Sequence, residues 1–242
     1  MPHSTQAYSA SGFSRRTNKL DDLLTEVGRA MQVLSGGAHA SRPNPAGKRH
    51  SVAAAAPQGA DALPAVEGPM QLTPAEQQHA AGLMRVNHVG EICAQALYRG
   101  QALFCGDAAT RNLLRKAASE EVDHLAWCQD RLSELGSRPS LLNPFWYAGS
   151  FTMGMLASRA GTRRNLGFMA ETEHQVEQHL DRHLKDLPAR DVRSRKIVEQ
   201  MREDEMAHRQ TAERQGASRL PAPIRLAMRG MSKIMTVSAY RI

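Results

Sequence analysis

Apolar positions along the chain recur mostly every three or four residues, which is the spacing of amphipathic helices. Leucine and valine at such intervals predict a helix over residues 19–34, with Gly36 just past its end. From Gly36 to about Met70 the chain is rich in Ala, Pro and Gly and shows little periodicity, so we expect a flexible linker there. Residues 1–70 are therefore predicted to form an N-terminal helix and linker that precede a folded domain.

The folded domain, residues 71–242, is predicted to be all-α. It opens with Thr73, Pro74 and Glu76, the pattern of a capping box with a proline in the first turn. No later segment alternates in the manner of a strand. The predicted helices cover residues 74–105, 108–135, 143–158, 162–187, 191–214 and 221–236. Four of them exceed 20 residues and are joined by short connections, which favours an antiparallel four-helix bundle with two additional amphipathic helices.

Ionisable side chains interrupt the apolar stripes of the four long helices. At about 100° per residue, Glu121 and His124 fall inside one stripe, and Glu173 falls inside that of residues 162–187. The helix over 191–214 carries two more such residues, and the first long helix places Glu91 on a half-apolar face. The six candidate ligands are Glu91, Glu121, His124, Glu173, Glu205 and His208.

This pattern predicts two metal ions in the bundle centre. Four unpaired carboxylates buried together would cost several kcal/mol each, roughly the whole stability margin of a domain, so cations are needed. A lone Glu followed in the next long helix by Glu-x-x-His occurs twice, which matches the dinuclear carboxylate site of ferritin-like bundles. Oxygen-rich ligation with one imidazole for each metal favours iron or manganese over zinc.

Two other Glu-x-x-His pairs are expected to lie outside the site. Glu76 and His79 belong to the first turn of a helix, while Glu171 and His174 fall on a polar face.

The acids that directly precede two ligand glutamates have a different expected role. Glu120 and Asp204 are predicted to accept a hydrogen bond from the ligand histidine of the opposite helix, and the alternative is a solvated acid.

Two segments outside the bundle indicate contact with a membrane surface. The segment 141–151 is rich in aromatic residues, and we expect these to lie at the level of lipid headgroups. The expected contacts are Phe145, Trp146, Tyr147 and Phe151. The alternative is an extra helix packed on the bundle. The two prolines in the uncharged run over 139–158 argue against a membrane span.

The charge distribution also favours contact with a membrane surface. The chain carries 31 basic and 24 acidic side chains, a formal charge of +7, and residues 214–242 hold six basic residues and no acidic one. Arg225, Arg229 and Lys233 lie on one helical face beside apolar residues, which favours an anionic membrane surface, with docking on the bundle or on a partner as the alternative. Such a distribution argues against a nucleic-acid partner. Three cysteines without close spacing are expected to be reduced core thiols, as in a cytoplasmic protein.

These motifs together resemble the demethoxyubiquinone hydroxylase family over about residues 71–242. The resemblance rests on Arg85-Val86-Asn87-His88-Val89-Gly90-Glu91, Glu121-Val122-Asp123-His124-Leu125, Ala170-Glu171-Thr172-Glu173-His174 and Asp204-Glu205-Met206-Ala207-His208, in this order and spacing. It implies a ferritin-like di-iron monooxygenase in which the six residues listed above hold two Fe ions. Where eukaryotic members have His-His-Tyr, this chain has Gln178-His179-Leu180, so no role is carried over to a tyrosine.

The resemblance also implies a reaction and a location. The enzyme would use O2 and an external reductant such as NADH to hydroxylate the ring of a polyprenyl methoxy-methyl-benzoquinol in ubiquinone biosynthesis. It would be a peripheral protein on the cytoplasmic side of the cell membrane, alone, as a homo-oligomer, or in a ubiquinone-biosynthesis complex. Two alternatives are an iron-oxidising or iron-storing ferritin-like protein and a non-catalytic lipid-binding assembly protein. Iron content separates the three, because storage requires many ions per assembly and an assembly protein requires none.

Overall fold

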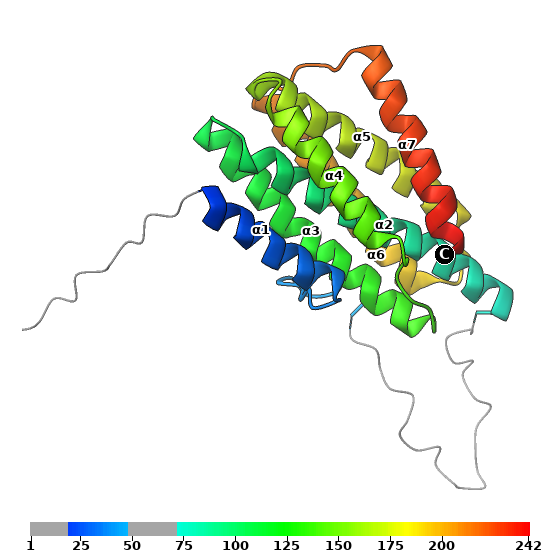
Figure 1. Ribbon diagram of the computed structural model, residues 1–242. Coiled ribbons are helices and arrows are strands. Elements are labelled where there is room, and N and C mark those ends of the chain that lie inside the picture. The colour runs from blue at the N-terminus through cyan, green and yellow to red at the C-terminus, as the bar shows by residue number, and fades with distance from the viewer. Residues whose placement is uncertain (1–18, 48–71) are drawn as a thin grey trace, which may run out of the picture.

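The computed structural model describes residues 19–47 and 72–242, and every regular element in those ranges is an α-helix (Figure 1). The helices are α1 (Lys19–Leu34), α2 (Pro74–Leu103), α3 (Ala108–Glu134), α4 (Asn143–Ser158), α5 (Thr162–Asp186), α6 (Val192–Arg214) and α7 (Ala222–Arg241). The prediction of an all-α fold is confirmed, and so is the capping box, since Thr73 and Glu76 exchange both of its hydrogen bonds.

The long helices α2, α3, α5 and α6 form the four-helix bundle. α2 packs along α3, α5 packs along α6, and contacts of α3 with α6 and of α2 with α5 join the two pairs. Two apolar clusters fill the bundle on either side of its middle. One contains Met84, Trp127 and Met201, and the other contains Leu114 and Met169. The residues between these clusters along each helix include the predicted metal ligands, which therefore lie between two water-excluding layers.

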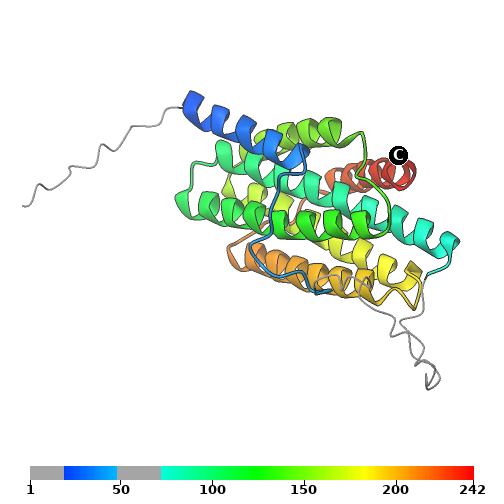
Figure 2. The same cartoon turned by 90° about the horizontal axis from the view of Figure 1, so that it is seen from below.

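The helices α1, α4 and α7 form a further layer on one side of the bundle. All three contact α2, and the view from below places them together on the side opposite α6 (Figures 1 and 2). α4 has the predicted bounds, whereas α7 continues five residues past its predicted end at residue 236. The additional turn is held by packing, because Ala239 lies against Val86 and Val89, and the ring of Tyr240 lies over Gly82 of α2.

The structure corrects two of the expected membrane contacts. Only 8% of Trp146 and 6% of Tyr147 are exposed, because Trp146 packs on Val89 and Tyr147 packs on Ile92. These rings belong to the core, so their assignment to the membrane surface is wrong. Phe145 is exposed, and Phe151 is half-buried with its ring stacked on Tyr147 at 6.3 Å between centroids. None of the helices in the described ranges is long and apolar enough to cross a membrane.

The structure also differs from the predicted flexible linker over residues 37–47. This segment crosses the surface of α3 and α6, where Ser41 contacts Asp123 and the Arg193 side chain donates to the carbonyl oxygen of Ala46. Hydrogen bonds and ion pairs fix it in place, and such contacts leave no periodic apolar pattern in the sequence. The remainder of the predicted linker lies outside the described residues.

Small residues allow α4 to approach α2 closely. A Cβ atom on Gly154 would overlap the carbonyl oxygen of Leu97, and one on Gly100 would overlap that of Phe151. We therefore expect Gly154→Ala to lower the free energy of unfolding by about 1–3 kcal/mol, measured by denaturant titration. Gly149→Ala in the same helix is the control, because its new methyl group meets no atom within 4 Å, and it should be neutral or slightly stabilising. Equal effects of the two substitutions would contradict this account of the helix contact.

Candidate metal centre

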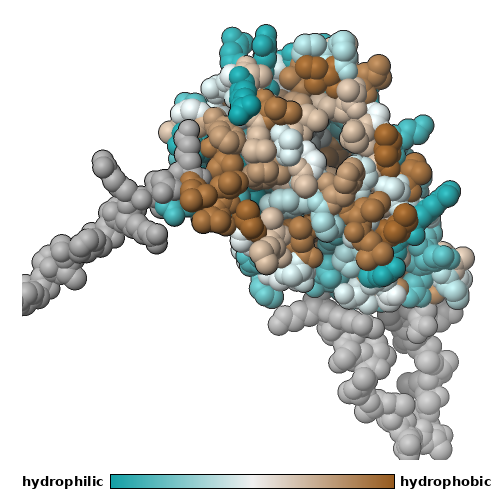
Figure 3. Space-filling view, viewed as in Figure 1, coloured by the Kyte–Doolittle hydropathy of each residue, from teal (hydrophilic) through white to brown (hydrophobic). Residues whose placement is uncertain are grey.

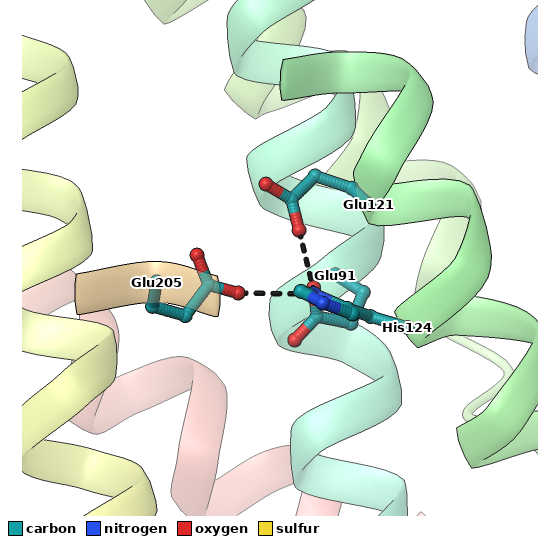
Figure 4. Close-up of side chains that lie close together, drawn as sticks. All are labelled: Glu91, Glu121, His124 and Glu205. Atoms are coloured by element: carbon teal, nitrogen blue, oxygen red, sulfur yellow. Dashed lines mark hydrogen bonds and ion pairs between the residues drawn. The ribbon is translucent and has the colours of Figure 1, made fainter. Parts of the chain in front are cut away.

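The structure brings all six predicted ligand residues together in the middle of the bundle. Their donor atoms form two overlapping groups in which every pair of atoms lies within 4.8 Å. One group consists of Glu91, Glu121, His124 and Glu205, and the other consists of Glu121, Glu173, Glu205 and His208. Figure 4 shows the first group, in which side chains from α2, α3 and α6 converge on the His124 ring. Each of the four bundle helices contributes at least one ligand.

Glu121 and Glu205 belong to both groups and face both histidines. Glu121 lies with one carboxylate oxygen 3.0 Å from Nδ1 of His124 and with the other 3.3 Å from Nδ1 of His208. The two oxygens of Glu205 lie in the same way, at 3.1 Å and 3.3 Å from these nitrogens. Carboxylates that present one oxygen to each of two positions are suited to bridge a pair of metal ions.

Glu91 and Glu173 each face one histidine only. Glu91 lies 3.4 Å from Nδ1 of His124, and Glu173 lies 3.7 Å from Nδ1 of His208. Each position thus offers one terminal carboxylate, two shared carboxylates and one imidazole nitrogen. This donor set suits iron or manganese better than zinc, which favours sites with more nitrogen or sulfur.

Burial and unsatisfied oxygens support the fit to metal ions. The four glutamates and His124 are buried, and 12% of the His208 side chain is exposed. One oxygen each of Glu91, Glu121 and Glu173 is buried without a hydrogen bond of good geometry, although those of Glu91 and Glu121 lie 3.4 Å and 3.3 Å from a histidine Nδ1. Such atoms are rare in folded proteins because each costs its full desolvation energy, and a bound cation would satisfy them.

The outward-facing nitrogens of both histidines meet carboxylates, as predicted. Nε2 of His124 lies 2.9 Å from Oδ2 of Asp204, and Nε2 of His208 lies 2.8 Å from Oε2 of Glu120. Each hydrogen bond runs between α3 and α6. Since the outer nitrogen donates, Nδ1 of the neutral imidazole keeps its lone pair directed toward the centre, which is the arrangement of metal-binding histidines.

Two contacts of this site were missed by the sequence interpretation. The hydroxyl of Tyr98 donates to Glu173 in a short hydrogen bond, and Arg42 pairs with Asp204 at 2.8 Å. Tyr98 lies two helical turns after Glu91 on the same face of α2, so this spacing could have predicted a tyrosine near the centre. Arg42 lies in the segment predicted as a linker, where no pattern pointed to it.

The predicted non-ligand pairs do lie outside the centre. Glu171 accepts a hydrogen bond from Gln175, and His174 contacts Gln178 one turn along α5. Leu180, which stands at the tyrosine position of the eukaryotic pattern, is buried in an apolar cluster. The three cysteines are free thiols.

Without a metal, the pKa values of the ligand residues are shifted in different directions. Burial raises the pKa of Glu91 and of Glu173 well above the ordinary range of a glutamate side chain. For the histidines, burial is outweighed by hydrogen bonds to carboxylates, and the pKa values of His124 and His208 are raised. Burial is outweighed in the same way at Glu121, because both histidines lie against this carboxylate and lower its pKa. Without a metal, burial and neighbouring groups thus shift Glu91, Glu173 and both histidines toward the protonated form and Glu121 toward the carboxylate.

Comparison with known proteins now places the chain in a family. The family model described as ubiquinone biosynthesis protein COQ7 matches residues 78–239, and this range contains all six ligand residues. The chain belongs to the COQ7 family. This membership confirms the resemblance drawn from the sequence motifs.

Curated relatives extend the similarity over nearly the whole chain. The 3-demethoxyubiquinol 3-hydroxylase of Bordetella parapertussis is 62% identical over 232 residues, which cover 96% of this chain and 97% of that protein. The proteins of the same name from Bordetella petrii and Ralstonia pickettii are 60% and 55% identical. They cover 98% and 92% of this chain, and 99% and 100% of their own lengths.

The protonation pattern predicts that metal binding releases protons. Because the pKa values of Glu91, Glu173, His124 and His208 are all raised, protons compete with a metal ion for these groups, and the metal affinity should fall as the pH is lowered. Anaerobic calorimetry with Fe(II) in buffers of different ionisation enthalpy measures the release. His174→Asn is the control and should behave as the wild type. Heats independent of the buffer would contradict the prediction.

Proposed function

We propose that this protein is a di-iron monooxygenase that hydroxylates the ring of demethoxyubiquinol in ubiquinone biosynthesis. The observation that carries the proposal is the coincidence of two independent findings. Curated relatives with up to 62% identity are named 3-demethoxyubiquinol 3-hydroxylase. The bundle also holds a buried centre of four glutamates and two histidines, a donor set suited to iron.

The six ligand residues would hold two iron ions, and Glu121 and Glu205 belong to both groups of donor atoms. When bound, the iron pair supplies the activation of O2 that protein side chains cannot perform. Glu120 and Asp204 fix the tautomer of the two histidines through the hydrogen bonds described above. Tyr98 holds the terminal carboxylate of Glu173 in place. The apolar clusters on both sides of the centre exclude water from it.

The layer of α1, α4 and α7 is proposed to rest on an anionic membrane, where a substrate with a long isoprenoid tail dissolves. Figure 3 shows hydrophobic side chains gathered over these three helices on one face of the molecule. The exposed apolar residues of this face include Leu24, Val27 and Met31 of α1, Phe145, Met153 and Leu156 of α4, and Leu226, Met231, Ile234 and Val237 of α7. Arg229 and Lys233 of α7 are exposed beside them, and Arg225 is half-buried. Such a surface is typical of a peripheral protein, here on the cytoplasmic side.

Iron storage and a non-catalytic assembly role are the alternative functions. Storage of iron in a protein cage does not require an exposed apolar face. A non-catalytic assembly protein does not require a buried cluster of carboxylates. Iron content measured per chain separates the three, because the proposed enzyme binds two ions. The external reductant, for which NADH is the candidate, is to be identified by direct measurement. The same holds for assembly of the protein with copies of itself or with other proteins of ubiquinone biosynthesis.

The hydroxylase reaction predicts a labelled product. After anaerobic reduction, addition of demethoxyubiquinol and ¹⁸O2 should give a product with one labelled oxygen atom by mass spectrometry. Glu173→Gln should lower turnover by at least about 100-fold, because it removes a carboxylate from the centre. Glu171→Gln is the matched control two residues away and should keep wild-type turnover. Oxidation of iron without any labelled product would overturn the proposal.

The membrane surface predicts binding to anionic vesicles. In flotation at low salt, the wild type should rise with vesicles that contain phosphatidylglycerol, and the double variant Arg229→Gln, Lys233→Gln should bind about 10-fold or more weakly, at about 1 kcal/mol for each charge. Lys116→Gln removes an exposed charge from α3 and should leave binding unchanged. Wild-type protein that stays at the bottom of the gradient would contradict the proposed surface.

A further inference from the structure

The segment over residues 37–47 brings one arginine to the edge of the metal centre. Ser41 donates its backbone N–H to Oδ1 of Asp123 at 2.6 Å, and Nε of Arg42 donates to Oδ2 of the same carboxylate at 2.8 Å. Asp123 is buried on α3, one residue before His124. A buried acid therefore anchors the Arg42 side chain to the helix that carries the ligand histidine.

The same guanidinium group reaches the carboxylate that holds His124. Nη2 of Arg42 donates to Oδ2 of Asp204 at 2.8 Å, and this oxygen also receives the hydrogen bond from Nε2 of His124. The guanidinium carbon lies 4.9 Å from the centre of the Trp127 ring, in the range of a cation–π contact. Arg42 thus links α3 to α6 around the outer edge of the His124 ring.

The other histidine has no equivalent contact in the described part of the chain. Its partner Glu120 meets only Lys116, at 3.4 Å, and 74% of the Lys116 side chain is exposed. Glu120 is itself more exposed than Asp204, with 34% against 19% of the side chain accessible, and His208 is more exposed than His124. The two metal positions therefore have the same types of ligand, but the acids that accept hydrogen bonds from the two histidines differ in their partners and in their exposure.

We propose that Arg42 is a positioning residue that makes the two metal positions unequal, so that the metal between Glu91 and His124 is held more tightly and released more slowly. The inference rests on the proposed two-iron centre. Arg42 confines Asp204, which confines the His124 ring, and the segment over 37–47 covers this side from water. A planar guanidinium can bind two carboxylates at once, whereas the point charge of lysine cannot hold both in this geometry.

Release of iron from the full-length protein tests this inference. The anaerobic protein loaded with Fe(II) is mixed with a chelator, and the wild type should release one iron quickly and one slowly. Arg42→Gln should accelerate the slow phase by about 10-fold or more and leave the fast phase unchanged, as expected for loss of a contact behind a metal ligand. Arg42→Lys should accelerate it by a smaller factor.

Mössbauer spectra of the reduced protein supply a readout that a general loss of stability does not produce. The wild type should show two distinct ferrous signals, and Arg42→Gln should shift only one of them. Asp204→Asn should shift the same signal, because Arg42 acts through Asp204. Lys116→Gln is the matched control on the other half and should leave both signals and both release phases unchanged.

A further control separates the effect of Arg42 on Asp204 from the attachment of residues 37–47 to the bundle. Arg193→Gln removes the hydrogen bonds to the carbonyl oxygens of Ala46 and Gly47 and does not touch Asp204, so slow release should persist. If Arg42→Gln fails to fold, Arg42→Lys supplies the comparison. Equal acceleration of both phases, or release independent of residue 42, would overturn the inference alone. A wild-type protein that does not bind two irons would overturn the proposed function on which it rests.

Discussion

The structure depends on the burial of four carboxylates around two imidazoles in the middle of the helical bundle. An unpaired buried charge costs several kcal/mol, and a domain of this size has a total stability of only about 5–15 kcal/mol. Each ring nitrogen of His124 and His208 therefore faces a carboxyl group. This requirement fixes the relative position of α3 and α6, because each helix supplies an inner ligand pair and the outer acid for the opposite histidine.

The six inner residues were predictable because each one breaks a local pattern. A glutamate inside an apolar helical stripe needs a compensating partner, so Glu121, Glu173 and Glu205 identify the centre before any tertiary contact is known. Glu91 was less distinct, and the structure gives the reason. α2 is covered by bundle helices on one side and by α1, α4 and α7 on the other, so it is buried almost all round and has no single apolar stripe.

The errors of the sequence interpretation share a physical cause. Trp146 and Tyr147 have the amphipathic rings of membrane-surface residues, but the same rings also pack well against the aliphatic side chains of a neighbouring helix, here Val89 and Ile92 of α2. The position of Arg42 depends on Asp204, which is 162 residues away in the sequence. Contacts of that kind follow from the folded geometry and leave no trace in helical periodicity or local composition.

The surroundings of the two histidines differ in their exposure to water. On the side of His124, α3 is overlaid by the segment that carries Arg42, and the ring is inaccessible to water. On the side of His208, Glu120 is partly exposed, and 12% of the His208 side chain is accessible to water. The apolar face over α1, α4 and α7 lies beside α2 and away from α6 (Figure 2). The buried ligands thus belong to the four bundle helices, whereas most of the large apolar side chains that are exposed in the described residues belong to α1, α4 and α7.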